Sequence, residues 1–264
     1  MRYLKIFFLH FQNAFVYKGI SFVYFLMSVF NIGLTVSFWR GTANGKAIAQ
    51  GWYFSDIFTY YMLALIANQL LISHMENTVA NIDIHEGNLS AYLLKPFSYF
   101  TTRFMSETPW RFVSTVLGLV IFFFFYFIIK ISISFAHSPL AIFLAVCVAI
   151  LGYFISFLFK MLLGILAFWV VEMRGLFEGT DAVTSILMGS FMPLVLLPQW
   201  ITSISNFSPF PYMIYYPVVA FEGKLNVVAL LFIILKEILW TGGMWILYKF
   251  LWQKGIEKYS AIGQ

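Results

Sequence analysis

Few residues in this sequence are placed to carry out catalysis. No two histidines have the i, i+4 spacing by which side chains on one helix face bind a metal ion. The four histidines are His10, His74, His85 and His137. No serine lies in a Gly-x-Ser-x-Gly turn, and the nearest approach to a phosphate-binding loop, Gly41 to Ala47, has the wrong spacing and no hydroxyl after Lys46. The sequence therefore predicts no catalytic residue, no metal site and no ATP site on this chain.

Two pairs of charged residues interrupt otherwise apolar segments. Lys236 and Glu237 are adjacent, so they point about 100° apart on a helix and do not pair face to face. One interpretation places at least one of them at a subunit interface or translocation path. The other has Lys236 reach the membrane surface while Glu237 pairs with a neighbouring helix. Glu107 and Arg111, spaced i, i+4, are predicted to form a helix-stabilising ion pair.

Four uncharged polar residues interrupt the first two apolar stretches. They are Asn31, Thr35, Asn68 and Gln69. In lipid such side chains require a partner on another helix or in water. We therefore take them as candidate pore residues, with hydrogen bonding between helices as the alternative. With Lys236 and Glu237 they make up the candidate translocation path or interface.

The composition indicates that lipid is the main solvent of the elements that carry these residues. The chain has 264 residues, of which 61% are hydrophobic and 10% charged, and its mean hydropathy is +0.86. Soluble domains have about 25% charged residues. The net charge of +5 does not point to a nucleic-acid partner, because the basic residues stand singly between apolar stretches.

The apolar stretches predict an all-α integral membrane protein, a single domain over residues 1–264 with six transmembrane helices. A bilayer core of about 30 Å requires roughly 20 apolar residues as helix. The predicted spans are 19–39, 57–75, 108–130, 139–171, 181–197 and 225–249. The fourth is too long for one straight crossing, so a kink or a cytoplasmic extension is expected. The fifth is followed by a proline-rich segment that we expect to enter the outer membrane face without crossing it.

The two ends of the chain are predicted to lie in the cytoplasm. Residues 1–18 alternate phenylalanine with polar residues at helical spacing, which indicates an amphipathic helix on the membrane surface. Six spans place most lysines and arginines on the cytoplasmic side. A seventh crossing is the alternative, but it would put Lys249, Lys254 and Lys258 outside.

The longest non-apolar cytoplasmic segment, residues 76–111, contains a short amphipathic stretch. An apolar cluster ends at Lys95 and Pro96, where a helix has to stop. The cluster consists of Leu89, Tyr92, Leu93 and Leu94. Docking on a soluble partner and lying on lipid headgroups are both open interpretations.

Three stretches, in this order along the chain, resemble the permeases of the ABC-2 family, specifically the six-span subunits of bacterial two-component ABC exporters. The first is Ile84-His85-Glu86-Gly87 with Leu89 and the run from Tyr92 to Pro96. The second runs from Pro209-Phe210-Pro211-Tyr212 through Tyr216-Pro217 to Gly223. The third is the tail with Trp252, Gly255, Tyr259, Ala261 and Gly263. His85 stands where the family pattern more often has arginine.

The resemblance implies the type-2 ABC exporter fold in a bacterial cytoplasmic membrane. Residues 1–18 would be its elbow helix, residues 82–96 its coupling loop, and the proline-rich stretch its re-entrant outer segment. It also implies a second permease, either the same chain or a homologue, and cytoplasmic ABC ATPase subunits that hold ATP and Mg²⁺, so this chain needs no cofactor. Alternating access would export a hydrophobic or amphipathic substrate. The implied ATPase-coupling residues are Asp83, Ile84, His85, Glu86, Gly87, Leu89, Tyr92, Leu93, Lys95 and Pro96.

Two other functions fit the same composition. One is an integral-membrane enzyme acting on a lipid, and the other is a scaffold subunit without a path of its own. An enzyme should be active when purified alone and should tolerate changes in the loop at 83–96, whereas a permease should lose coupled ATP hydrolysis.

Overall fold

The computed structural model describes residues 2–13, 18–43, 48, 51–130 and 133–259, which form helices joined by turns and short loops. The helices and helical turns are α1 (Arg2–Asn13), α2 (Lys18–Ala43), α3 (Phe54–Leu71), η1 (Thr78–His85), α4 (Leu89–Leu93), α5 (Tyr99–Ile129), α6 (Pro139–Ile165), η2 (Leu166–Phe168), α7 (Arg174–Leu187), η3 (Leu194–Leu196), α8 (Gln199–Asn206), η4 (Phe210–Tyr212), α9 (Tyr215–Phe221) and α10 (Val227–Lys258). The all-helical class predicted from the sequence is thus observed in the described residues.

Three of the described helices are long and apolar enough to cross a bilayer. They are Tyr99–Ile129, Pro139–Phe168 and Val227–Lys258. The predicted surface helix at 1–18 corresponds to α1, and positions 1 and 14–17 lie outside the described residues. Positions Ala261 and Gly263 of the tail also lie outside them.

Local sequence explains where the long helices begin and end. Ser98 and Asn226 stand at the N-caps of α5 and α10, and each side chain accepts a hydrogen bond from the backbone three residues later. Pro139 occupies the first turn of α6, where its missing N–H is harmless. At the other end of α5, Lys130 adopts a left-handed conformation with φ of 54°, which terminates the helix.

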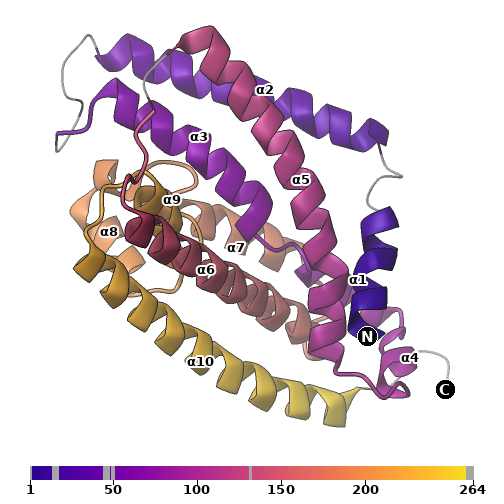
Figure 1. Ribbon diagram of the computed structural model, residues 1–264. Helices are drawn as coiled ribbons and strands as arrows, with labels where there is room; N and C mark the ends of the chain where they lie inside the picture. The colour runs from indigo at the N-terminus through magenta and orange to yellow at the C-terminus, as the bar shows by residue number, and fades with distance from the viewer. Residues whose placement is uncertain (1, 14–17, 44–47, 49–50, 131–132, 260–264) are drawn as a thin grey trace.

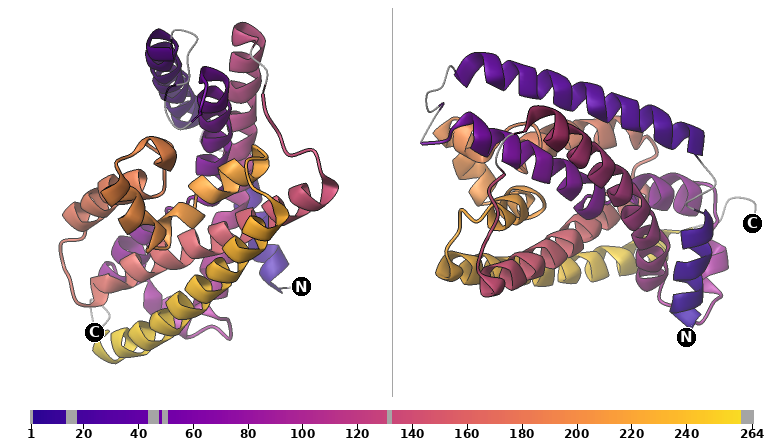
Figure 2. Two further views of the ribbon diagram at one scale, coloured as in Figure 1. Left: turned by 90° about the vertical axis from the view of Figure 1, so that its left-hand side faces the viewer. Right: turned by 45° about the horizontal axis from the view of Figure 1, so that its top comes forward.

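The long helices pack around α6. It lies along α10 on one side and contacts α3 and α9 on another, while α2 and α5 pack against α3 (Figure 1). One end of the bundle carries α1, α4 and the last turns of α10, and the opposite end carries α9 and the first turns of α6 and α10 (Figures 1 and 2). The helix α1 lies against the N-terminal part of α5.

Two glycines let other segments approach α6 closely. A Cβ at Gly152 would lie 2.4 Å from the backbone oxygen of Tyr212, and one at Gly164 would lie 2.7 Å from the Val79 side chain. Small residues at helix contacts permit such backbone approach. The short segments around η4 and η1 are therefore held directly on α6.

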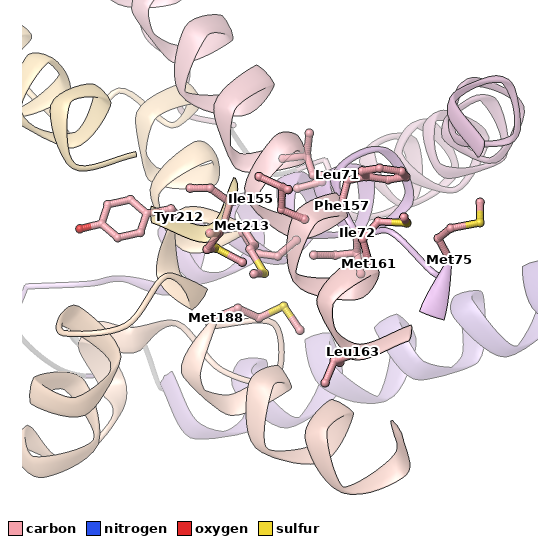
Figure 3. Close-up of a cluster of buried hydrophobic side chains, with 14 of the residues drawn as sticks. Leu71, Ile72, Met75, Ile155, Phe157, Met161, Leu163, Met188, Tyr212 and Met213 are labelled. Carbon is pink, nitrogen blue, oxygen red and sulfur yellow. The ribbon is translucent and has the colours of Figure 1, made fainter. Parts of the chain in front are cut away.

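Four buried methionine side chains lie in the core around α6. Met75, Met161, Met188 and Met213 are buried together with Leu71, Ile155 and Phe157, and they come from the segment after α3, from α6 and from the chain on both sides of α8 (Figure 3). We call these four residues the methionine seam.

The prediction of a helix over 181–197 is wrong. The helix in this region is α7, which begins at Arg174 and ends at Leu187, and η3 follows only at Leu194. Gly189 has a φ of +77°, a conformation that ends a helix, and Pro193 restricts the chain shortly afterwards. The predicted helix was placed here because the stretch 182–197 has no charged residue. The absence of charge does not distinguish a helix from an apolar segment that is not helical.

The predicted span at 139–171 is a helix up to Phe168, and residues 169–173 form a turn that leads into α7. The proline-rich stretch after Leu197 is not simply irregular. It consists of α8, η4 and α9 separated by turns. Its end is fixed beside the segment that precedes α6, because the Ala136 amide donates to the Phe221 carbonyl at 2.9 Å.

Candidate functional site

The segment 78–96 is built from two short helical pieces and a tight turn, and we call it the coupling segment after the role that the resemblance implies for residues 82–96. The π-helical piece η1 ends at His85, and Gly87 follows with a φ of +81°, which is a conformation that favours glycine. The helix α4 then ends at Leu93, before Lys95 and Pro96, as predicted from the proline. π-helical turns are rare and are frequent at functional sites.

A buried ion pair fixes the coupling segment to α5. The Asp83 side chain is fully buried, and it accepts hydrogen bonds from the Arg103 guanidinium and the Tyr99 hydroxyl, both on α5. Burial raises the pKa of the Asp83 carboxyl, while the positive charge of Arg103 opposes that rise. Because an unpartnered charge is costly in this environment, the pair holds η1 in one position on α5.

Two further contacts fix the segment to other parts of the bundle. The Tyr259 hydroxyl, at the end of α10, donates to the Gly87 carbonyl at 2.9 Å and lies 3.2 Å from the Ser90 hydroxyl. His85 Nε2 lies 3.2 Å from the carbonyl oxygens of both Ala167 and Val170, at the end of α6. The coupling segment is therefore attached to α5, α6 and α10 at once.

The predicted coupling residues divide into anchors and an exposed edge. Asp83, Ile84 and Leu89 are buried, and His85 and Tyr92 are half-buried. The exposed residues are Glu86, Leu93, Lys95 and Pro96. Leu94, between them, is 88% exposed. This edge is free to contact another molecule.

Two buried charge clusters support the same end of the bundle. The predicted pair forms as expected, with Arg111 Nη2 2.9 Å from Glu107 Oε1. Glu107 also accepts from the Ser73 hydroxyl at 2.7 Å and the His74 amide at 2.8 Å, so it binds the segment that follows α3.

The second cluster centres on a lysine that the sequence analysis did not single out. Lys160 Nζ, on α6, lies 2.9 Å from Glu76 Oε1 and 2.6 Å from Asp181 Oδ1 on α7. Lys160 and Glu76 are buried, whereas the Asp181 side chain is half exposed. A charged residue inside an apolar run was the available signal, but nothing in the sequence names its partners.

The four candidate pore residues meet at one cavity. A cavity of about 580 Å³ lies between α2, α3 and the residues that end and follow α7. It is lined by Met27, Asn31, Ile32, Thr35, Tyr61, Ala64, Leu65, Asn68, Gln69, Ser185, Ser190 and Phe191. None of these lining residues carries a charge, so the cavity has neutral hydrogen-bonding groups between apolar walls.

The polar groups of the cavity differ in whether they already have partners. Asn68 donates to the Ala64 carbonyl at 2.8 Å and accepts from the Ser190 hydroxyl at 3.1 Å. Thr35 donates to the Asn31 carbonyl of its own helix at 2.9 Å. Within the described part of the chain, the side-chain amides of Asn31 and Gln69 make no hydrogen bond. These two amides are available to a bound molecule.

Lys236 and Glu237 do not belong to this cavity. They lie on α10, where Lys236 is exposed and Glu237 is fully buried. The Glu237 carboxyl has no hydrogen-bond partner among the described residues, so the pairing with a neighbouring helix is not observed. The structure therefore separates these two residues from the other four path candidates.

Sequence reasoning missed residues in both regions. The sequence did not identify the three residues that hold the coupling segment in place, which are Arg103, Tyr99 and Tyr259. Ser185, Ser190 and Phe191 of the cavity were missed because they follow a helix whose bounds were misplaced. The charge of Arg103 inside the predicted cytoplasmic loop was the one signal that could have found its role.

Comparison with known proteins gives one result for the whole chain. A family model described as "ABC-2 family transporter protein" matches residues 29–263. A search of curated proteins gives no match. The matched range includes the coupling segment, α10 and the residues that line the cavity, except Met27.

Proposed function

Because the match spans most of its length, the chain belongs to the ABC-2 family of transporter proteins, and we propose that it is the exporter permease that receives movement from an ATPase through the coupling segment. The observation that carries this proposal is the division of that segment. Its anchors Asp83 and Leu89 are buried, while Leu94 is 88% exposed. A segment that is fixed to the helix bundle on one side and exposed on the other is placed to transmit movement from a partner to the bundle.

The proposed topology has six spans with both termini in the cytoplasm of a bacterium. The spans are α2, α3, α5, α6 and α10, together with a crossing formed by α7 and the turns up to residue 197, of which α7 is helical only up to Leu187. In this arrangement α1 is the elbow helix on the membrane surface, and α8, η4 and α9 are the re-entrant outer segment. The end of the bundle that carries α4 then faces the cytoplasm, in agreement with the positive-inside rule.

Energy enters this permease through separate ATPase subunits that hold ATP and Mg²⁺. Closure of the ATPases would push on Leu93 and Leu94. The attachments of Asp83, His85 and Gly87 would pass that movement to α5, α6 and α10 together. Such rigid-body motion of packed helices is a common route to alternating access.

The cavity supports an uncharged or amphipathic substrate. It offers the Asn31 and Gln69 amides beside apolar walls and no charged side chain. A ligand shifts the equilibrium between the inward and outward states only if it binds them differently. The cavity is formed by α2, α3 and the residues after α7, so relative movement of these elements would change its contacts. A second permease, either the same chain or a homologue, would complete the path.

The first test is to purify the tagged protein in mild detergent and to identify its partners by mass spectrometry. We expect a stoichiometric ATP-binding subunit. Leu94→Asp should abolish its co-purification or its coupled ATP hydrolysis without unfolding the permease, because Leu94 is exposed. Phe207→Asp is the matched control, since Phe207 is 89% exposed and follows α8 at the other end of the bundle.

Two outcomes would contradict the proposal. Wild-type co-purification and coupled ATP hydrolysis in Leu94→Asp would contradict the role proposed for the coupling segment. Reproducible absence of an ATP-binding subunit from folded protein would favour the alternative, an integral-membrane enzyme acting on a lipid.

A further inference from the structure

A second, smaller cavity lies between the surface helix α1 and the chain that leads from α4 into α5. Its volume is about 260 Å³. It is lined by Ile6, Leu9, His10, Tyr92, Lys95, Phe97 and Thr102. The proposed transport mechanism uses Tyr92 and Lys95 as part of the coupling segment but assigns no ligand to this cavity.

The polar side of the cavity is positive. Lys95 Nζ lies 5.1 Å from the centroid of the Tyr92 ring, and the Arg103 guanidinium lies 4.5 Å from the same centroid. Burial lowers the pKa of His10, and the positive charge of Arg103 lowers it further. The field of Arg103 therefore reaches the cavity even though Asp83 pairs with this residue. None of the described residues that line the cavity is acidic.

The other side of the cavity is apolar and continues onto the surface of α1. Ile6 and Leu9 form this wall, and Leu9 and the adjacent Phe8 are each 59% exposed. A helix of this kind lies at the boundary between headgroups and acyl chains. With α1 on the membrane surface, as in the proposed topology on which this inference rests, the cavity joins a cationic pocket to an apolar surface at the depth where a phospholipid changes from phosphate to hydrocarbon.

We propose that this cavity binds the headgroup of an anionic phospholipid. Lys95 pairs with the phosphate, and the acyl chains follow Leu9 along α1. The Thr102 hydroxyl already donates to the Ser98 carbonyl at 2.9 Å, so its oxygen accepts a hydrogen bond from a headgroup hydroxyl. Anionic lipids attract basic groups at the cytoplasmic surface of membranes. A bound lipid would join α1 to the coupling segment, since Tyr92 and Lys95 belong to that segment.

The experiment measures lipid binding by the full-length protein in neutral detergent, using fluorescent phosphatidylglycerol and the matching phosphatidylcholine. Binding needs neither ATP nor a transported substrate, so this test can fail while the transport proposal stands, and the reverse. We expect preferential binding of phosphatidylglycerol and a fall in its affinity of about tenfold in Lys95→Gln. Lys95→Arg should retain most of the affinity.

Lys249→Gln provides the matched control. Lys249 is also exposed and lies over an aromatic ring, at 5.4 Å from the Trp245 centroid, but it is on α10. An equal loss of phosphatidylglycerol affinity in this variant would show that binding depends on general surface charge, and it would overturn the proposal. Leu9→Asn tests the apolar wall. It should weaken the binding of phosphatidylglycerol and leave the protein folded, because Leu9 is exposed.

Inorganic phosphate distinguishes the two sources of the anion. We expect millimolar phosphate to compete poorly, because it lacks the acyl chains. Full competition by phosphate, or equal affinity for the two lipids, would contradict a lipid site.

Discussion

The two ends of the bundle hold their buried carboxylates in different ways. At the end that carries the coupling segment, Asp83, Glu107 and Glu76 each accept a hydrogen bond from a buried cation. At the opposite end, Glu222 is buried and lies 3.4 Å from Lys224 Nζ, yet neither of its oxygens has a hydrogen-bond partner among the described residues.

Glu222 lacks a hydrogen bond among the described residues because the nearby cation, Lys224, is directed toward other groups. Lys224 Nζ lies 2.8 Å from Asp56 Oδ1 and 4.0 Å from the centroid of the Trp52 ring. Burial consequently raises the pKa of the Glu222 carboxyl to about 8, although Lys224 opposes the rise. The comparison teaches that each of these three buried carboxylates at the coupling end has its own cation, whereas at the opposite end Lys224 is directed to Asp56 and leaves the Glu222 carboxyl without a hydrogen bond in the described part of the chain.

The largest expected effect comes from separating the pair that anchors the coupling segment. Asp83→Leu leaves the Arg103 guanidinium buried without its carboxylate. We expect the free energy of unfolding to fall by about 3 kcal/mol or more, measured by denaturant titration in micelles. The double variant Asp83→Leu with Arg103→Met should recover most of this loss. A double variant as unstable as the single one would show that packing, and not charge matching, holds this end.

The next effect tests a contact that involves no charge, the close approach of the Tyr212 backbone to Gly152 near the middle of α6. Gly152→Ala places a Cβ against the Tyr212 carbonyl, so we expect a loss of about 1–3 kcal/mol in the same titration. Gly242→Ala on α10 is the control, because no atom lies within 4 Å of its Cβ. Alanine there should be neutral or should stabilise by up to about 1 kcal/mol. Equal behaviour of the two variants would contradict the close approach.

A smaller effect is a pH dependence that arises from Glu222, which follows α9 outside the helices proposed to span the membrane. Its folded pKa of about 8 exceeds the ordinary value of 4.5, so the folded protein retains a proton that the unfolded chain has lost. Stability should therefore decrease as pH rises from about 5 to 8. Glu222→Gln should flatten this slope, measured as the thermal midpoint against pH. An unchanged slope in the variant would assign the dependence to another group.

The smallest effects concern the neutral cavity. Asn68 has a partner in Ser190, so Asn68→Leu should cost about 1 kcal/mol. The Asn31 and Gln69 side chains have no partner in the described structure, and Asn31→Leu or Gln69→Leu should change stability by less than about 0.5 kcal/mol. Losses as large as that of Asn68→Leu would favour hydrogen bonding between helices over a pore role for these amides.

The sequence contained enough to predict the helical class, the end of α4 before Pro96 and the pair Glu107–Arg111, because these depend on composition or on residues a few positions apart. The sequence also singled out Asn31, Thr35, Asn68 and Gln69 as polar residues inside spans, but it did not predict the cavity that they line together. The partners Asp83–Arg103 and Lys160–Asp181 were not predicted. Both pairs are separated by about twenty positions, and their contact depends on how helices cross. The bounds of α7 were missed because an apolar run without charge has no signature of where its helix ends.

The methionine seam would allow the surfaces that meet at it to slide past one another. Met75, Met161, Met188 and Met213 lie where α6 meets the segments before η1 and around α8 (Figure 3). Thioether side chains are unbranched and adopt many shapes at similar energy, so they can refill the space when one surface shifts along another. A core of branched side chains would resist the same shift, because each new position would open voids or force strained rotamers. The same seam is chemically vulnerable, since oxidation to the sulfoxide would place polar groups in its centre and stop the sliding.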